Sequence, residues 1–464
     1  MGDKMEKKSL WEAQPYMAEP FSYVDPLYEM GVFRTRKKQS IFEFLLGETQ
    51  PPEKLISRLI DTYEMNRLNY LKQSGLLFLI FPSSTHTRFA HSIGTMNLGL
   101  YAMERIRVKG LHGIETLEDY LSRNGLMEEF LVALLLHDIG HMPFSHTLEG
   151  ANKVKEKYGD HECITLNLLD ENSSIYKRLK KYADEKGSET AVSVCKDYGE
   201  VDISVVIGLL SGEINDPIKE LISGHLDIDR LDHCYRDSFF IGLKFATINI
   251  VGFLNSLVLE VEPNNPRIVV REDGVQHILH LLFAREMLFQ KAFDNDFNCA
   301  YNAMLTYAVE KWLDENPEEI DNLPFITEET LLAKLTTCKV TQKMIDRIFN
   351  RKPYYLLYKG ETTLKEEQVS ERFHEWKARN AWEEDDFILY LPADFQQYTR
   401  ASKEWLARNT PVLVGRKTVV LGNFHSDLFD YFAKQAAKRM RTIRVFSKKK
   451  LDNNKREKLE EALT

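Results

Sequence analysis

The sequence predicts a mainly α-helical protein with a smaller mixed α/β C-terminal portion. Helical periodicity dominates roughly the first 300 residues, as in segment 53–73, where Leu, Ile and Tyr recur on one face with charges between them. Beyond about residue 320, short β-branched or aromatic runs are bounded by turn residues, which is the pattern of strands. We find no internal repeat at a fixed period.

In chain order, segment 81–89 (FPSSTHTRF) predicts a loop that enters a helix starting near Thr87. Segment 127–137 (MEEFLVALLLH) is almost entirely apolar after its glutamates, which predicts a helix buried on most sides that ends near Gly140. The same periodicity predicts further helices over 162–170, 173–186, 201–211, 217–222, 229–241 and 275–314.

Three short runs predict strands in the C-terminal portion: 386–392 (DFILYLP), 410–422 (TPVLVGRKTVVLG) and 442–446 (TIRVF). We therefore expect an N-terminal extension over 1–22, a helical body over 23–315 and a mixed α/β region over 316–464 that carries a basic tail.

Composition narrows the class of protein. The content of 43% hydrophobic and 28% charged residues is ordinary for a globular protein with a large core. Five cysteines without a CxxC pair argue against a disulfide framework and a thiolate zinc site, and favour the cytoplasm. The sequence lacks a signal core and any run of about eighteen apolar residues, so we expect no membrane association. A net charge of -9 leaves phosphate recognition to local Arg, Lys and His.

Histidine is unevenly distributed, with six of the 13 between residues 86 and 146. A lone histidine is more often structural than a ligand, but His137 is followed by Asp138 at the end of the very apolar helix. Burying an imidazole beside an ionised carboxylate is costly without partners, and a divalent metal is one such partner. Imidazole and carboxylate ligands suit Mn, Fe, Zn, Ni or Co without choosing among them. Magnesium is a further candidate at substrate phosphates.

Two more ligands are expected from elsewhere in the chain. RFAHS supplies His91, and 227–237 (DIDRLDHCYRD) supplies a dense group of acids. A lone HD dipeptide is a weak signal, whereas H…HD…D on successive predicted helices is a strong one.

With these motifs the sequence resembles the HD-domain phosphohydrolase superfamily, and within it the deoxynucleoside triphosphate triphosphohydrolase branch that includes the sterile-alpha-motif/HD dNTPase. The matching segments follow the family order: YVDPLYE (23–29), LIDTYEMNRLNYLKQSG (59–75), FPSSTHTRFAHSIG (81–94), HDIGHMPFSHTLEG (137–150), HE (161–162) and LDIDRLDHCYRD (226–237). The resemblance implies an HD-domain helical body.

The resemblance also implies roles for single residues. It implies four metal ligands: His91, His137, Asp138 and Asp229. It implies a phosphate-side group in which one histidine protonates the leaving group and an acid orients a neighbouring histidine: His141, His146, His161 and Glu149. It implies contacts to phosphate from Arg88, Arg230 and, by a looser match, Lys291, and contacts to the sugar from Gln73 and Asp237. His233 stands where the branch commonly has a tyrosine near the sugar.

The implied reaction is metal-dependent hydrolysis of a dNTP to deoxynucleoside and triphosphate. Two alternatives stay open: another HD chemistry (a nucleotide monophosphatase or a phosphodiesterase), and a nucleotide-sensing or nucleic-acid-binding protein that keeps the site for binding. Resemblance further implies an activating nucleotide and a homo-oligomer, either dimer or tetramer. Segment 434–458 carries eleven basic residues against two acids, which predicts a solvated tail or, alternatively, a nucleic-acid contact.

Overall fold

The computed structural model describes residues 55–110, 113–199, 201–244, 247–261, 266–379, 382–392, 408–415 and 417–450, with positions 457, 459–461 and 463. The predicted extension over 1–22 and the motif at 23–29 lie outside these residues.

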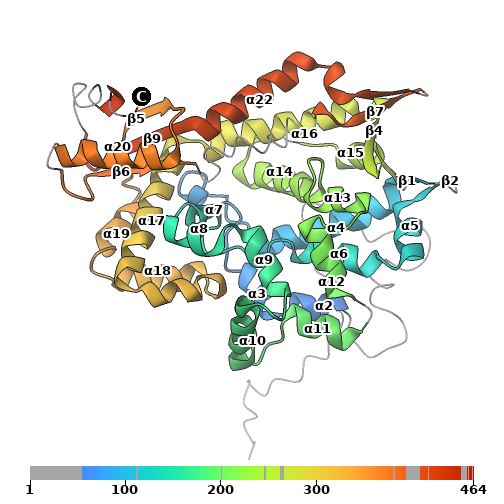
Figure 1. The fold of residues 1–464 in the computed structure, drawn as a ribbon, viewed down its shortest axis with the longest axis horizontal. Coiled ribbons are helices and arrows are strands. Elements are labelled where there is room, and N and C mark those ends of the chain that lie inside the picture. Colours follow the sequence, from blue (N-terminus) through green and yellow to red (C-terminus); the bar gives the residue numbers. More distant parts are fainter. Residues whose placement is uncertain are drawn as a thin grey trace, which may run out of the picture.

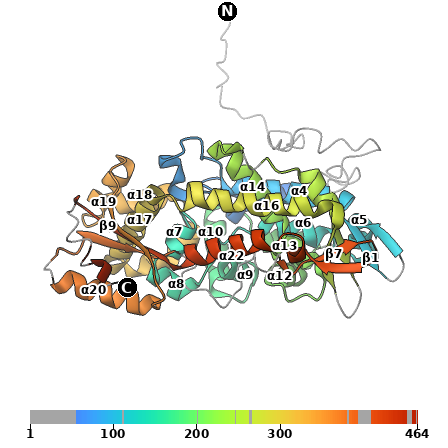
Figure 2. The same ribbon diagram turned by 90° about the horizontal axis from the view of Figure 1, so that it is seen from above.

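The fold is mainly α-helical, which confirms the predicted class (Figures 1 and 2). The first group of helices is α2 (Leu55–Ile60), α3 (Tyr63–Leu68), α4 (Arg88–Arg105), α5 (Leu117–Asn124), α6 (Met127–Leu136), α7 (His146–Glu149), α8 (Asn152–Tyr158), α9 (His161–Leu169), α10 (Ser174–Lys186), α11 (Ala191–Tyr198), α12 (Ile203–Ser211), α13 (Glu220–Ser223), α14 (Ile228–Ile241) and α15 (Ile250–Asn255). The second is α16 (Val275–Leu288), α17 (Asp296–Glu315), α18 (Glu328–Thr337), α19 (Gln342–Phe349), α20 (Glu366–Arg379) and α22 (Ser426–Arg441).

The predicted helix over 275–314 is in fact two helices. After α16, residues Phe289–Phe293 form a π-helical turn, and α17 begins at Asp296. Asn295 caps α17, because its side chain accepts a hydrogen bond from the Phe297 amide. An extra residue per turn shifts the face that later side chains present, so simple helical spacing fails across this point.

Strands occur in both parts of the chain. The predicted C-terminal strands are present as β6 (Phe387–Tyr390), β7 (Pro411–Val414), β8 (Lys417–Val420) and β9 (Thr442–Ser447). Five strands were not predicted: β1 (Arg107–Gly110), β2 (Gly113–Thr116), β3 (Leu257–Glu260), β4 (Arg267–Arg271) and β5 (Tyr355–Glu361). One sheet has the order β2-β1-β3-β4-β7-β8 and the other the order β5-β9-β6. Because β4 pairs in parallel with β7, C-terminal strands complete a sheet that begins in the helical body.

The main hydrophobic core also joins the two parts. Every residue from Phe130 to Leu136 in α6 has no solvent exposure, and Phe429 and Phe432 of α22 belong to the same core. Helix α22 lies along α16 in both views (Figures 1 and 2). The first half of the basic segment is therefore ordered in α22 and in the fully buried strand β9, so it is no solvated tail. Among the described residues, none forms a helix both long and apolar enough to cross a bilayer.

Glu64 in α3 gives a testable pH dependence of stability. Burial raises the pKa of this carboxyl to about 7, from an ordinary value of 4.5. Because the pKa is raised in the folded state, the stabilising contribution is complete below pH 4.5 and is lost as pH rises through 7. We expect the free energy of unfolding of wild type, relative to Glu64→Gln, to fall by about 2 kcal/mol between about pH 5 and about pH 8.

Urea unfolding of both proteins at each pH measures this difference. The glutamine keeps an oxygen that can accept the hydrogen bond Glu64 receives from the Ala191 amide. Parallel pH profiles for the two proteins would contradict the buried, protonated carboxyl.

Candidate metal centre

Three helices bring the predicted metal ligands together. Thr87 caps α4, accepting a hydrogen bond from the Ala90 amide, so His91 lies in the first turns of that helix. Packing of the apolar helix α6 against α4 places His137, the C-cap of α6, beside His91. Helix α14 also packs against α4 and presents Asp229 in its first turn.

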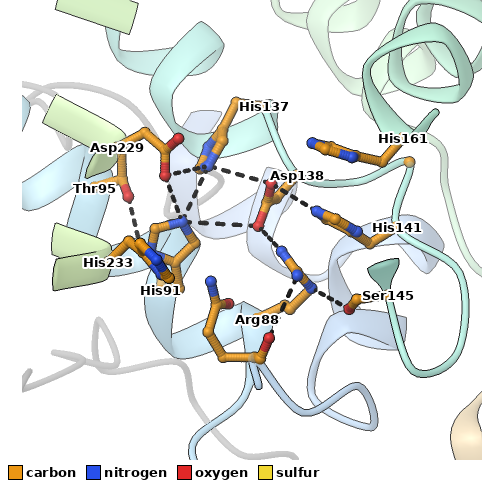
Figure 3. Close-up of polar contacts among 12 residues, drawn as sticks. Arg88, His91, Thr95, His137, Asp138, His141, Ser145, His161, Asp229 and His233 are labelled. Carbon is orange, nitrogen blue, oxygen red and sulfur yellow. Dashed lines mark hydrogen bonds and ion pairs between the residues drawn. The ribbon is translucent and has the colours of Figure 1, made fainter. Parts of the chain in front are cut away.

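Ligand atoms of His91, His137 and Asp138 lie within 4.8 Å of one another, and Asp229 lies beside the two imidazoles (Figure 3). The Nε2 atoms of His91 and His137 are 3.2 Å apart, and Asp229 Oδ1 lies 2.9 Å from the first and 3.5 Å from the second. Asp138 approaches with Oδ2 at 3.7 Å from His91 Nε2 and Oδ1 at 3.4 Å from His137 Nε2. Ligands held about 2.0–2.2 Å from one ion lie about 3–4 Å from each other, so these separations fit a single divalent metal.

The far side of each imidazole is fixed. His91 Nδ1 lies 2.6 Å from Asp232 Oδ2, and His137 Nδ1 lies 2.8 Å from the Leu134 carbonyl oxygen. Asp232 is in turn held by two hydrogen bonds of 2.9 Å from Arg236. A partner at Nδ1 sets the tautomer and turns Nε2 toward a metal, which is the usual arrangement of metal-binding histidines.

Electrostatics at the centre also favour a cation. Burial disfavours the charged form of His91, but hydrogen bonds to Asp229 and Asp232 outweigh burial and raise its pKa to about 10. Burial opposes ionisation of Asp138, yet the charges of Arg88 and His137 hold its pKa well below the ordinary value. The buried carboxylates therefore stay ionised and attract positive charge.

Arg88 bridges the metal ligands and the loop after them. Its Nη1 donates to Asp138 Oδ2 at 2.5 Å and its Nε donates to Ser145 Oγ at 2.6 Å (Figure 3). Ser145 and its neighbour Phe144 have φ values of 50° and 59°, in the left-handed region that side chains seldom adopt. Strain of this kind persists where surrounding contacts impose it, and here the loop presents a hydroxyl to Arg88.

A second group of histidines lies beside the first. Glu149 holds two of them, with Oε2 2.8 Å from His146 Nδ1 and Oε1 2.9 Å from His161 Nδ1. His141 stacks on His161, with ring centroids 3.8 Å apart, and its Nε2 lies 3.3 Å from Asp138 Oδ1. Burial and the charge of Arg88 hold the pKa of His141 well below its ordinary value, whereas Glu149 outweighs burial and raises the pKa of His161. The trio thus pairs a neutral imidazole with a readily protonated one.

The sequence around this site matches two known protein-family models. The HD domain family matches residues 88–186, and the HD associated region matches residues 254–388. The chain belongs to the HD-domain phosphohydrolase superfamily.

Individual relatives of this HD protein are distant. An uncharacterized protein of Methanocaldococcus jannaschii is 29% identical over 64% of this chain and 54% of its own length. A Dictyostelium discoideum protein named deoxynucleoside triphosphate triphosphohydrolase SAMHD1 homolog is 25% identical over 69% of this chain and 60% of its own. The chain thus spans less than two thirds of each of these relatives. A phosphohydrolase structure from Bacteroides thetaiotaomicron has the same fold, with a TM-score of 0.60 at 19% identity over 86% of this chain and 97% of its own.

Three residues predicted to contact the sugar or to lie near it are described first: Gln73, His233 and Asp237. Gln73 accepts a hydrogen bond from Arg88 Nη2 at its backbone oxygen, 3.4 Å away. Asp229, His233 and Asp237 follow at four-residue spacing on one face of α14. Asp237 is completely buried, with Oδ2 2.9 Å from His233 Nδ1 and Oδ1 2.6 Å from His86 Nε2.

The two remaining cations are placed differently. Arg230 Nη1 donates to the His225 carbonyl oxygen at 2.6 Å, and Lys291 is exposed in the π-helical turn. Arg285, six residues before Lys291 and not predicted, is partly buried. Burial and the charges of Arg230 and Arg439 lower its pKa to about 9. Because the charge of Arg230 acts on Arg285, we expect Arg285 to lie closer to Arg230 than the exposed Lys291 does.

Sequence reasoning also missed Asp232, Arg236 and His86. Helical spacing offered a signal for the first two, since Asp229, Asp232 and Arg236 stand at positions i, i+3 and i+7 of one predicted helix. His86 had no such signal, because it belongs to the loop before α4.

Proposed function

We propose that the protein hydrolyses deoxynucleoside triphosphates to deoxynucleoside and triphosphate, with His91, His137, Asp138 and Asp229 as ligands of one divalent transition metal. The metal assignment rests on the proximity of these four side chains. It rests also on the partner that each imidazole has at Nδ1. The distant Dictyostelium relative named as a triphosphohydrolase supports the substrate.

The bound metal would supply a water nucleophile that is deprotonated near neutral pH, together with positive charge against the phosphoryl oxygens. In this chain, Arg88 is positioned beside Asp138 to offset charge that builds on the phosphate. Water attacks the α-phosphorus, the bond from phosphorus to the 5′-oxygen breaks, and that oxygen takes a proton. We assign the proton to His146 or His161, because Glu149 binds both at Nδ1 and leaves Nε2 to donate.

Product analysis tests the proposal. Metal-loaded protein is incubated with each dNTP, singly and in mixtures, and the products are separated by ion-exchange chromatography. We expect triphosphate and deoxynucleoside from wild type and at least a 1000-fold lower rate from Asp138→Ala, because the variant loses a metal ligand and the partner of Arg88. Mixtures reveal whether one nucleotide activates cleavage of another.

Other products point to other functions. Release of orthophosphate identifies a monophosphatase, and opening of a diester identifies a phosphodiesterase. Release of pyrophosphate from a dNTP would contradict the proposed release of triphosphate. Binding of nucleotide without turnover by metal-loaded protein identifies a sensing role.

A further inference from the structure

A cavity of about 760 Å³ opens next to the phosphate-side residues. Gln73, Ser145 and His146 line its inner end, while α17, α20 and β6 form the remaining walls. This volume lies within the range of about 300–1,000 Å³ that is common for small-molecule sites. Helix α20 and strand β6 belong to the C-terminal part of the chain, so that part helps to enclose the cavity.

Helix α14 and the π-helical turn after α16 connect the metal ligands with this cavity. One turn after Asp229 in α14, the ring of His233 stacks on Phe293, with centroids 5.9 Å apart and planes inclined by 19°. Phe293 lines the cavity. A nucleotide whose phosphates lie at His146 and Arg88 would therefore have room for its nucleoside in the cavity.

The inner end contains buried acceptors without partners. Asn298, at the start of α17, lines the cavity and is 4% exposed. Its amide nitrogen donates to the Phe293 carbonyl oxygen at 3.0 Å, which fixes the orientation of the amide. Asn298 Oδ1 then has no hydrogen-bond partner, and neither have the neighbouring buried atoms Gln73 Oε1 and Ser74 Oγ. Burying an acceptor without a partner is unfavourable, and a ligand with N–H donors would supply the missing hydrogen bonds.

The outer end is electrically balanced. Lys153 pairs with Asp314, Lys311 pairs with Glu384, and Lys377 donates to the Glu384 carbonyl oxygen. With its cations engaged, the outer end has little to offer phosphate, whereas the rings of Tyr307 and Phe373 offer apolar contact. The cavity thus suits an uncharged aromatic group whose edge donates hydrogen bonds.

We propose that this cavity is the base subsite and that Asn298 Oδ1 reads the amino group that adenine carries at C6 and cytosine at C4. The inference rests on the proposed nucleotide substrate. Guanine at C6 and thymine at C4 carry a carbonyl oxygen instead, so these bases leave the Asn298 acceptor unmatched. Asn298 is then a specificity-determining residue of this chain.

The test combines changes in the ligand with a change in the protein. Metal-loaded full-length chain is compared on dATP and on the analogue that lacks the 6-amino group, with dCTP and its analogue that lacks the 4-amino group as a second pair. We expect kcat/KM to be about 10-fold higher for the amino-bearing member of each pair. In Asn298→Leu this preference should disappear. Leucine offers no acceptor to the amino group, so the two members of a pair should react at similar rates.

The comparison of ratios cancels any general loss of folded protein. Asn302→Leu is the matched control, since Asn302 lines the same cavity one turn later but its Oδ1 already accepts from Thr147 Oγ1 at 3.2 Å. This variant should keep the preference. Loss of the preference in both variants, or its absence from wild type, would overturn the inference.

Calorimetric binding of non-hydrolysable dNTP analogues separates this inference from the proposed function. Amino-dependent binding that Asn298→Leu abolishes, without turnover of any dNTP, would uphold the base subsite and refute the hydrolase. If triphosphate is released at equal rates from both members of each pair and both bind equally well, the hydrolase is upheld and the base subsite is refuted.

Discussion

Replacing Gly140 by alanine is expected to abolish turnover and to lower the free energy of unfolding by about 3 kcal/mol. A Cβ at Gly140 would lie 2.3 Å from the His161 carbonyl oxygen and 2.5 Å from the Thr165 amide nitrogen. Backbone atoms cannot rotate away, so the loop carrying Asp138 and His141 must separate from α9. The stacked pair of His141 and His161 would then be lost, together with the alignment of Asp138.

Gly208→Ala is the matched control for this substitution. Gly208 also lies in the helical body, within α12, but the nearest atom to its added Cβ is 3.8 Å away, on the Ile214 side chain. Alanine at an open helical position stabilises a protein by up to about 1 kcal/mol, and turnover should be unchanged. Thermal unfolding and triphosphate release measure both effects, and near-wild-type activity in Gly140→Ala would refute the close packing of this loop.

Replacing Asp232 by asparagine is expected to weaken metal binding by about 10–100-fold, although Asp232 is not itself a proposed ligand. The carboxylate orients His91 through Nδ1 and is fully buried. Its loss also removes the bidentate partner of the buried Arg236, which should cost about 3–5 kcal/mol of stability. Metal titration at a temperature where the variant remains folded measures the affinity directly.

Glu260→Gln distinguishes an effect on His91 from general destabilisation. Glu260 is likewise a buried carboxylate, paired with Lys109 and Arg267, but it lies in β3 rather than at the metal centre. We expect this variant to lose stability and to keep its metal affinity. Equal metal affinities in the Asp232 and Glu260 variants would show that Asp232 does not position His91.

Local signals account for what could be predicted. The Thr87 cap and the apolar run before His137 each act over a few residues, and the structure has both helices where the sequence placed them. Strands β1, β3 and β4 are four or five residues long, and the pairings of β1 with β3 and of β4 with β7 join segments far apart in the chain, so local patterns do not reveal this sheet. A strand this short offers too little alternation to separate it from a loop.

At the candidate site, helical spacing gives little guidance where the helix changes its period. The π-helical turn over Phe289–Phe293 breaks the spacing between α16 and α17. The charge of Arg230 acts on the partly buried Arg285, while Lys291 is exposed. The contact between His86 and Asp237 joins a loop to a helix and depends on tertiary packing alone.

The parallel pairing of β4 with β7 has a consequence for biosynthesis. As the chain leaves the ribosome, β4 has its partner β3 on one side at once, but its other edge stays open until Val412 has been made and can lie opposite Val270. An open edge strand invites pairing with other chains. The sheet beside the metal-binding helices can therefore be completed only after nearly the whole polypeptide has been synthesised. We expect fragments that stop before β7 to aggregate when they are expressed, even though they contain all four proposed metal ligands.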